Sequence, residues 1–482
     1  MISTIPSTTL NPPIPLVTDL DGTLIKTDSL WEGFYALLAT RPWRTLLIPF
    51  WLFSGITVLK SMLSEYSLKG VTTWPLNDAV LGELQKAQNE GRPIYLATAA
   101  DRRIAEAVAA RMDCFAGVFA SDGVNLKGSP KAELLCSYFG ASGFDYIGDS
   151  NADIPVWKSC REALYVGSGD AMLLRAVKKA GVTCRCLDSL SPVTLRVYLK
   201  GLRVAQWAKN VLIFAPMFLA HQFTLKSILL CCIAALAFCA CASSAYILND
   251  LLDLPADRSH TLKKARPFAA GLIPLWQGPP LILLGLCVGA LCTLFLPPPF
   301  GIVLIGYYLL TLFYSFRLKR LIFIDIIVLA SLYCIRMGAG AATLALSLSN
   351  WALSFSFFIF LGLALIKRVA EFNMRTADGD SNVRGRAYIM ADKSLLETMT
   401  VCAGFSAEII LMLYIDSLNA LSLYSKPWLL WMLCPTILYW YGRMLFIMHR
   451  GKMLDDPVIF VLTDKNSLAC ITIGVLVTIA SI

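Results

Sequence analysis

Three aspartates at regular spacing follow an almost uncharged apolar segment. The stretch NDLLDLPADRSHTLKKARP begins at Asn249, directly after about twenty residues that are suited to a membrane. On a helix, the carboxylates of Asp250, Asp253 and Asp257 would project from one face within about 60° of one another. Carboxylates this close repel unless they bind a cation, and Mg2+ suits them because it prefers oxygen ligands and bridges to phosphates. The spacing predicts a magnesium site, and the alternative is a solvated loop with accidental spacing.

Four short motifs in the amino-terminal part could build a second acidic site. PLVTDLDGTLIKTDSL places two acids after an apolar strand, IYLATAAD ends a second strand, SPKAELL opens a helix, and FDYIGDSNADIPVW follows a third strand. Their order and residue types resemble the haloacid dehalogenase superfamily of aspartyl phosphatases, over about residues 14–170. The resemblance implies a Rossmann-like α/β domain with a helical cap.

In such a phosphatase Asp19 is the expected nucleophile, which forms an aspartyl phosphate. Asp21 would protonate the leaving oxygen and then activate water. Thr98 and Lys131 would orient and neutralise the phosphoryl oxygens, with Lys127 as the alternative for the lysine role.

Magnesium is the expected cofactor of this phosphatase site. Asp149 would complete a Mg2+ site with Asp19 and Asp21, the latter through its backbone, and Asp153 would support it. The alternatives are strand-end acids on an inert α/β domain, or a domain that kept the fold and lost turnover.

About 75 residues separate Thr23 from Thr98, enough for a cap over the site at about residues 28–90. Within it, residues 45–59 are apolar, but 15 residues are too few to span a bilayer. A crossing would also put Asp19 and Thr98 on opposite sides of the membrane. We expect this segment to rest on the cytoplasmic leaflet. The alternative is a cap core buried against protein.

The composition predicts a membrane protein, because 57% of the 482 residues are hydrophobic, which is more than a soluble core needs. The long uncharged runs begin only near Val211. Nine runs could cross a bilayer, namely residues 211–222, 227–248, 279–297, 300–316, 322–344, 350–366, 396–417, 427–447 and 466–482.

Basic residues gather in the loops after the second, fourth and sixth of these runs, whereas the connections LPPPFG and LALSLSN carry no charge. The positive-inside rule therefore places the basic loops and the amino-terminal domain in the cytoplasm, at a bacterial inner membrane. The net charge of +9 then reflects topology, and no nucleic-acid partner is predicted. The fifteen cysteines, many of them inside apolar runs, are interpreted as small buried hydrophobes.

The acidic stretch resembles the first aspartate-rich motif, N-D-x-x-D-x-x-x-D-R, of the UbiA-type intramembrane prenyltransferases. The likeness covers roughly residues 200–482 and includes LRVAQWAKN, YSFRLKRLIFID and KRVAEF. It implies an all-α transmembrane domain that holds a diphosphate through Mg2+ in a cavity open to the cytoplasm. We therefore predict a phosphatase domain over residues 1–195 and a UbiA-type domain over residues 196–482, with one Mg2+ in each active site.

Most members of that family show a second acidic motif of D-x-x-x-D type after the sixth helix. This chain has KRVAEFNMRTADGDSNVRGRAYIMAD there, which is more basic. In this respect it is similar to the decaprenyl-phosphate phosphoribosyltransferase branch. Basic groups suit a donor with a 5-phosphate and a diphosphate, together with a lipid phosphate acceptor.

The resemblance implies substitution at the anomeric carbon of phosphoribosyl diphosphate by a polyprenyl phosphate. Asp250 and Asp253, with Asp257, would hold the Mg2+ that neutralises the departing diphosphate. The candidate substrate-binding residues are Asn249, Arg258, Lys263, Arg266, Tyr314, Lys319, Arg336, Lys367, Arg368, Glu371, Arg386 and Tyr388.

Two of these residues have alternatives. Arg336 lies inside the fifth apolar run, where a cation is costly, so it either binds a substrate phosphate or pairs with an acid such as Asp325. Tyr314 is either a cavity hydroxyl or an interfacial aromatic residue.

Fusion of a phosphoribosyltransferase to a phosphatase on one membrane face suggests consecutive reactions, with the phosphatase removing the 5-phosphate from the lipid product. The alternatives are prenyl transfer to an aromatic acceptor, a lipid or phosphate transporter with a regulatory head, and a phosphatase with another substrate. The sequence leaves the polyprenyl length and formation of a homo-oligomer open.

Overall fold

The computed structural model describes residues 13–167, 182–188, 193–377, 388–453 and 456–482. The chain divides into two compact units. The first consists of Met1–Gly201 with Leu248–Pro280, and the second of Leu202–Ile247 with Leu281–Ile482. Nothing in the sequence pattern indicated that the acidic loop would group with the amino-terminal residues.

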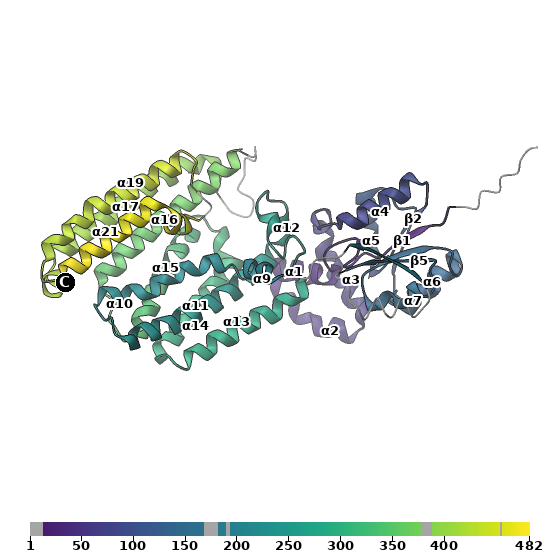
Figure 1. Cartoon of the computed structure of the whole chain (residues 1–482), viewed down its shortest axis with the longest axis horizontal. Coiled ribbons are helices and arrows are strands. Elements are labelled where there is room, and N and C mark those ends of the chain that lie inside the picture. The colour runs from purple at the N-terminus through teal and green to yellow at the C-terminus, as the bar shows by residue number, and fades with distance from the viewer. Residues whose placement is uncertain (1–12, 168–181, 189–192, 378–387, 454–455) are drawn as a thin grey trace, which may run out of the picture. The chain divides into compact units, whose positions relative to one another are not determined.

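A parallel sheet forms the centre of the first unit (Figure 1). It has six strands in the order β3-β2-β1-β4-β5-β6. The strands are β1 Leu16–Thr18, β2 Ile94–Asp101, β3 Gly117–Ser121, β4 Asp145–Gly148, β5 Glu162–Val166 and β6 Thr183–Asp188. The central strands β1 and β4 are buried throughout, as expected of a parallel sheet covered on both faces. The predicted α/β fold is confirmed.

Helices cover both faces of this sheet. The helices are α4 Asp78–Asn89, α5 Arg102–Met112, α6 Ser129–Phe139 and α7 Ile154–Trp157, and the short helix α9 Leu195–Gly201 follows the last strand. Leu84 of α4 and Ile104 of α5 share one apolar core with Leu96 of β2. On the other face, Leu135 of α6 and Trp157 of α7 pack with Val17 and Tyr146. The strand order reverses between β1 and β4, and the loops at the carboxyl ends of these strands are where such folds bind ligands.

A small helical group lies between β1 and β2 and contains α1 Ser29–Thr40, η1 Pro42–Leu47, α2 Ile48–Phe53, α3 Ile56–Ser67 and η2 Leu68–Thr73. Asp28 caps α1 by accepting hydrogen bonds from the amides of Leu30 and Trp31. Leu37, Leu59 and Leu63 form the core of the group. The apolar run 45–59 is therefore divided between short helices that turn at Gly55, which has a φ of 119°.

The second unit is helical. Its helices are η4 Val204–Phe214, α10 Ala215–Leu219, α11 Leu225–Leu252, α13 Gly278–Thr293, α14 Pro298–Phe316, α15 Ile324–Thr343, α16 Asn350–Ala377, α17 Lys393–Ile415, α18 Leu418–Leu423, α19 Leu433–His449, α20 Pro457–Thr463 and α21 Lys465–Ser481, of which α11 and α13 each extend into the first unit. Within the described residues, seven helices are long and apolar enough to span a membrane. The pair α20 and α21, bent by 79°, would make an eighth span.

The predicted count of nine spans is not confirmed. The predicted first span, residues 211–222, falls in η4 and α10, and the apolar helix there covers only Val204–Leu219. Pro216 lies in the first turn of α10, and His221 turns the chain at a φ of 55°, so the apolar run does not become one long α-helix.

Close helix packing in the second unit depends on small residues. Tyr441 of α19 lies against Gly362 of α16 and Gly404 of α17, where a Cβ atom would come within 2.2 and 2.0 Å of its ring or hydroxyl. The hydroxyl of Tyr441 donates to the carbonyl of Thr400 at 2.7 Å. Larger residues at either glycine would force these helices apart.

Candidate active sites

Asp19 stands at the carboxyl end of β1, where the strand order reverses. Its amide donates to the carbonyl of Ile147 at 2.9 Å, so the pairing of β1 with β4 extends to the aspartate itself. Its Oδ1 accepts a hydrogen bond from the amide of Leu20 at 2.8 Å. The backbone thus fixes this carboxylate at the sheet edge.

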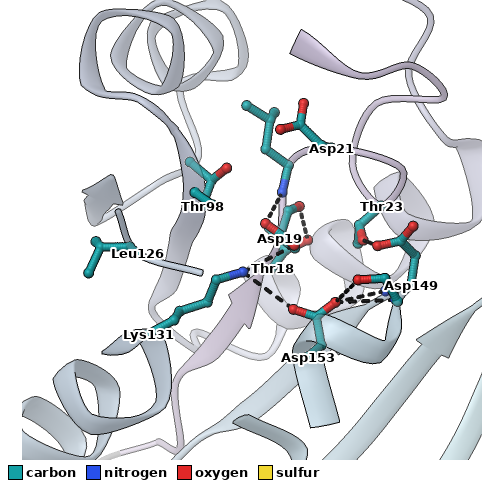
Figure 2. A network of polar contacts seen from close by, with 12 residues as sticks. Thr18, Asp19, Asp21, Thr23, Thr98, Leu126, Lys131, Asp149 and Asp153 are labelled. Atoms are coloured by element: carbon teal, nitrogen blue, oxygen red, sulfur yellow. Dashed lines mark hydrogen bonds and ion pairs between the residues drawn. The ribbon is translucent and has the colours of Figure 1, made fainter. Parts of the chain in front are cut away.

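Lys131 connects Asp19 to Asp153 (Figure 2). Its Nζ lies 3.1 Å from Asp19 Oδ2 and 3.3 Å from Asp153 Oδ1, and it donates to the Tyr146 hydroxyl at 2.8 Å. The Tyr146 hydroxyl in turn donates to Asp153 Oδ1 at 2.9 Å. Lys131 is buried, whereas the alternative, Lys127, is exposed. The lysine is therefore held with its charge at the nucleophile.

The carboxylates of Asp19, Asp149 and Asp153 form a cluster that fits a divalent cation. Each offers one oxygen, and these oxygens lie within 4.8 Å of one another. The hydroxyl of Thr23 donates to Asp149 Oδ1 at 3.3 Å. Three hard oxygen donors with a single lysine among them are the ligand chemistry that Mg2+ prefers.

The raised pKa values of these carboxyl groups also favour a bound cation. Burial raises the pKa of the Asp19 carboxyl to about 6, against the opposing effect of Lys131. Burial, with repulsion from Asp19, raises the pKa of Asp149 well above its usual range. A bound cation would relieve both effects, because it favours the ionised carboxylates.

Asp21 is oriented by the first helix of the cap. Its Oδ1 accepts from the amide of Ser29 at 2.7 Å, and its Oδ2 accepts from the Ser29 hydroxyl at 3.0 Å. Burial, together with Asp28, raises the pKa of Asp21 to about 8, so the carboxyl can hold a proton at neutral pH. Gly22, which follows Asp21, has a φ of 72°, and a Cβ atom there would come within 2.2 Å of Asp149 Oδ2. Only glycine fits this turn.

A cap lysine near the site was missed by sequence reasoning. Thr98 is buried in β2, and its hydroxyl accepts from the amide of Ala100 at 3.0 Å. Lys60 of α3 donates to the carbonyl of Ala99 at 2.6 Å and to Asn125 Oδ1 at 3.2 Å. Its position between strand and cap has no local sequence signal, because its partners lie 39 and 65 residues away.

The acidic loop differs from the single helix that the spacing suggested. Helix α11 ends at Leu252, Asp253 stands at the break, and a short helix, α12, covers Leu254–Arg258. Pro255 at the start of α12 explains the break, because proline is tolerated in the first turn of a helix and not in its interior.

Two of the three aspartates nevertheless share a cation. Arg266 Nη1 lies 3.2 Å from Asp250 Oδ1 and 2.6 Å from Asp257 Oδ2. Burial raises the pKa of Asp257 to about 6, with Arg266 acting against it. The guanidinium of Arg266 thus compensates two buried carboxylates. Binding of Mg2+ by the acids of this loop stays a prediction.

Arg336 lies in the middle of α15 and contacts neutral groups. Its Nε donates to Asn210 Oδ1 at 2.9 Å, its Nη2 to the Tyr307 hydroxyl at 3.0 Å, and its Nη1 to the carbonyl of Leu332 at 2.5 Å. It is buried, and within the described residues no carboxylate lies within 4.0 Å of it. The alternative pairing with Asp325 is therefore not what the structure has.

Asp325 pairs with Arg368 instead. Arg368 Nε donates to Asp325 Oδ2 at 2.7 Å, and its Nη1 donates to both carboxylate oxygens of Glu371 at 2.9 Å. Its Nη2 donates to the Tyr314 hydroxyl at 3.0 Å. Tyr388 donates to Asp325 Oδ1 at 2.5 Å. Arg368 thus contacts two other predicted substrate-binding residues, Glu371 and Tyr314, and shares Asp325 with a third, Tyr388. Asp325 was the alternative partner considered for Arg336.

A further acid, Asp456, gathers two lysines. Lys209 forms an ion pair with its Oδ2, and Lys367 lies 3.8 Å from the same oxygen. Lys209 also lies over the Tyr333 ring, at 5.6 Å from its centroid. Sequence reasoning missed Asp456 because it follows the last basic loop, far from the quoted motifs.

The other predicted binding residues have these positions: Asn249 is in α11, Lys263 is in the short turn Lys263–Ala265, Lys319 is in the short turn Leu318–Arg320, and Arg386 lies outside the described residues.

Comparisons with known proteins identify the families of both parts of the chain. A family model of UbiA prenyltransferases matches residues 211–462, which is more than half of the chain. The chain belongs to the UbiA prenyltransferase family. A haloacid dehalogenase-like hydrolase model matches residues 16–158, so this UbiA protein carries an amino-terminal HAD domain. Its long apolar helices form a multi-pass membrane domain.

The UbiA chain is similar to the following three proteins. Protein y4nM of Sinorhizobium fredii, whose function is uncharacterized, is 37% identical over 94% of this chain and 88% of its own. Decaprenyl-phosphate phosphoribosyltransferase of Corynebacterium glutamicum is 36% identical over 38% of this chain and 56% of its own. A UbiA homolog from Archaeoglobus fulgidus, solved with GPP and Mg2+, has 15% identity and a TM-score of 0.46 over 58% of this chain and 99% of its own.

Within the first unit, the arginine of the UbiA motif forms a buried ion pair with the HAD cap. Arg258 Nη2 and Nη1 lie 2.6 and 3.1 Å from the two carboxylate oxygens of Glu32, and Arg258 Nε donates to the Ala269 carbonyl at 2.9 Å. Thr27 donates to Glu32 Oε1 at 2.6 Å. The side chains of Arg258 and Glu32 are 4% and 5% exposed, so neither charge is compensated by water.

Glu32→Ala should therefore destabilise the HAD domain of the UbiA protein by about 3–5 kcal/mol, because it leaves a buried guanidinium unpaired. Thermal unfolding in detergent measures this loss. Glu65→Ala is the matched control, because Glu65 lies 3.8 Å from Arg103 in an exposed pair, worth less than about 1 kcal/mol. Equal shifts for the two variants would contradict the buried pair.

Proposed function

We propose that the protein transfers 5-phosphoribose from phosphoribosyl diphosphate to a polyprenyl phosphate, and that its HAD domain then removes the 5-phosphate from the lipid-linked product. The observation that carries the first part is Arg336, a buried cation in the membrane domain whose contacts are neutral oxygens. A cation in this setting calls for an anion, and phosphate is the anion of both proposed substrates.

In the transferase reaction, an oxygen of the lipid phosphate attacks the anomeric carbon, the bond from that carbon to the diphosphate oxygen breaks, and diphosphate departs. Asp250 and Asp253, with Asp257 beside them, would hold Mg2+, which supplies positive charge to the leaving group. Arg336 would bind a phosphate group in the membrane domain. The nucleophile is already ionised, so the reaction needs no general base.

In the phosphatase reaction, Asp19 attacks the 5-phosphate and the ester oxygen leaves with a proton from Asp21. Lys131 neutralises charge on the phosphoryl oxygens. Asp21 then takes a proton from water, which attacks the aspartyl phosphate and releases inorganic phosphate. Asp19, Asp149 and Asp153 would hold Mg2+, which screens the charge of the phosphoryl group. The raised pKa of Asp21 supports its role as the acid.

In this proposal the protein lies in a bacterial inner membrane, and both of its active sites face the cytoplasm. The loops that carry the basic residues, including Arg258, Lys319 and Lys367, alternate with uncharged connections on the other side.

A choice of donors tests the transferase. The protein in proteoliposomes receives either ribose-labelled phosphoribosyl diphosphate with polyprenyl phosphate, or labelled polyprenyl diphosphate with an aromatic acid. We expect labelled lipid only from the first pair, and only with Mg2+ present. Product from the second pair alone would contradict the proposal and identify the protein as an aromatic prenyltransferase. Transport of intact lipid without any product would identify it as a transporter.

A further inference from the structure

The HAD cap carries a compact exposed apolar surface, which we call the cap hook and define as residues 42–56. It comprises η1, α2 and the turn into α3. Its outward side chains are Trp43, Leu46, Leu47, Phe50, Leu52, Phe53 and Ile56, of which Phe53 is 91% and Leu46 76% exposed. Seven large apolar side chains within fifteen residues form the kind of contiguous patch that marks an interaction surface.

The exposure follows from how the hook folds. Ile48 and Trp51 point inward and pack against the core of Leu37, Leu59 and Leu63. Because the hook is only about one helix thick, its remaining apolar residues have no protein layer of the first unit to cover them. The fold therefore uses one side of the hook for the cap core and leaves the other side for a partner.

The composition of the hook matches the membrane interface. No charged residue occurs from Thr45 to Leu59, and Arg41 and Arg44 stand at one end. Arg44 lies over the Trp43 ring, 5.1 Å from its centroid. Tryptophan and arginine at the edge of an apolar surface suit the headgroup region, where the indole is amphipathic and the cation meets anionic lipid.

The membrane helices of the same chain also bring the HAD domain to a lipid surface. The described residues include seven helices that are long and apolar enough to span a bilayer, so the HAD domain is covalently tethered to a membrane domain. We propose that the cap hook inserts into the lipid interface and holds the HAD active site at the membrane surface, where a lipid-linked phosphate ester is its substrate. The substrate part of this inference rests on the proposed function, whereas the insertion does not.

The hook continues directly into the wall of the active site. Helix α3 begins at Ile56 and carries Lys60, whose Nζ bonds the carbonyl of Ala99, next to Thr98. A lipid surface that holds the hook thereby holds one side of the site.

Photo-crosslinking of lipid tests the insertion. The full chain is reconstituted in vesicles that contain anionic phospholipid and a photoactivatable phospholipid, and adducts are mapped by mass spectrometry. We expect adducts within residues 45–60 and none at Tyr138, which is 63% exposed on the body of the domain and serves as the matched control. Equal labelling of the control, no labelling of the hook, or crosslinks from the hook only to protein would overturn the proposal.

A charged hook tests its consequence. In Phe50→Asp with Phe53→Asp, we expect at least about tenfold slower release of phosphate from the lipid-linked sugar phosphate in vesicles, and hydrolysis of p-nitrophenyl phosphate within about twofold of wild type. Tyr138→Asp is the control. Undiminished turnover of the lipid substrate would overturn the role of the hook. If the wild-type hook is labelled by lipid but the protein dephosphorylates no lipid-linked sugar phosphate, the insertion stands and the proposed substrate fails.

Discussion

Asp19→Asn is expected to accumulate a lipid-linked ribose that still carries its 5-phosphate. The amide cannot attack phosphorus, so hydrolysis by the HAD domain should fall at least about a thousandfold. The transferase of the same chain uses other residues and should keep its rate. Chromatography of the lipid products from labelled phosphoribosyl diphosphate, in proteoliposomes with polyprenyl phosphate, measures both quantities.

The control for Asp19→Asn is Asp122→Asn, because Asp122 is an exposed acid of the same domain and pairs only at the surface with Arg102. Its products should match those of wild type. If Asp19→Asn yields the same dephosphorylated lipid as wild type, the HAD domain is not the phosphatase of this sequence of reactions.

Asp250→Asn should lower transfer of phosphoribose by at least about 100-fold, because the departing diphosphate loses its magnesium-held charge compensation. Asp253→Asn should also lower the rate of phosphoribose transfer. The HAD domain of either variant should still hydrolyse p-nitrophenyl phosphate, which separates loss of the site from loss of the fold. The rate of diphosphate release, measured over a range of Mg2+ concentrations, reports the effect.

Asp416→Asn is the matched control for the second prediction, because Asp416 is an exposed acid of the membrane domain outside the acidic motif. It should leave the rate and its dependence on Mg2+ unchanged. A transferase that keeps its full rate without Asp250 would remove the acidic motif from the mechanism.

The acidic cluster of the HAD domain could be predicted from sequence because its signals are local. Asp19, Thr98 and Asp149 each stand at or near the end of a strand, and parallel strands bring such ends to one edge of the sheet. The sequence favoured Lys131 and left Lys127 as the alternative, because both lie near the start of α6, and in the structure only Lys131 is buried.

The membrane domain was harder to predict, because its polar contacts join distant helices. Arg368 meets Asp325 across 43 positions, and Lys209 meets Asp456 across 247. Charge alone could not tell that Arg368 has carboxylate partners and that Arg336 has neutral ones. In the structure Arg368 is held by ion pairs, whereas Arg336 is a candidate for binding a substrate phosphate.

The count of spans failed for a related reason. An apolar run reports hydropathy, and a span also needs a continuous helix of sufficient length. Residues 211–222 are apolar, yet Pro216 and the turn at His221 keep their helices short. In the same way Pro255 breaks the helix that the aspartate spacing suggested, although Arg266 still brings Asp250 and Asp257 together.

A double-labelled donor tests the central claim of two consecutive reactions most directly. Phosphoribosyl diphosphate carries radiocarbon in the ribose and radiophosphorus in the 5-phosphate, and the wild-type protein acts on it in proteoliposomes with polyprenyl phosphate and Mg2+. The account predicts that both labels enter the lipid together, and that the phosphorus label then leaves it as inorganic phosphate while the carbon label stays. A lipid that never acquires the carbon label, or one that keeps both labels in constant ratio, would contradict it.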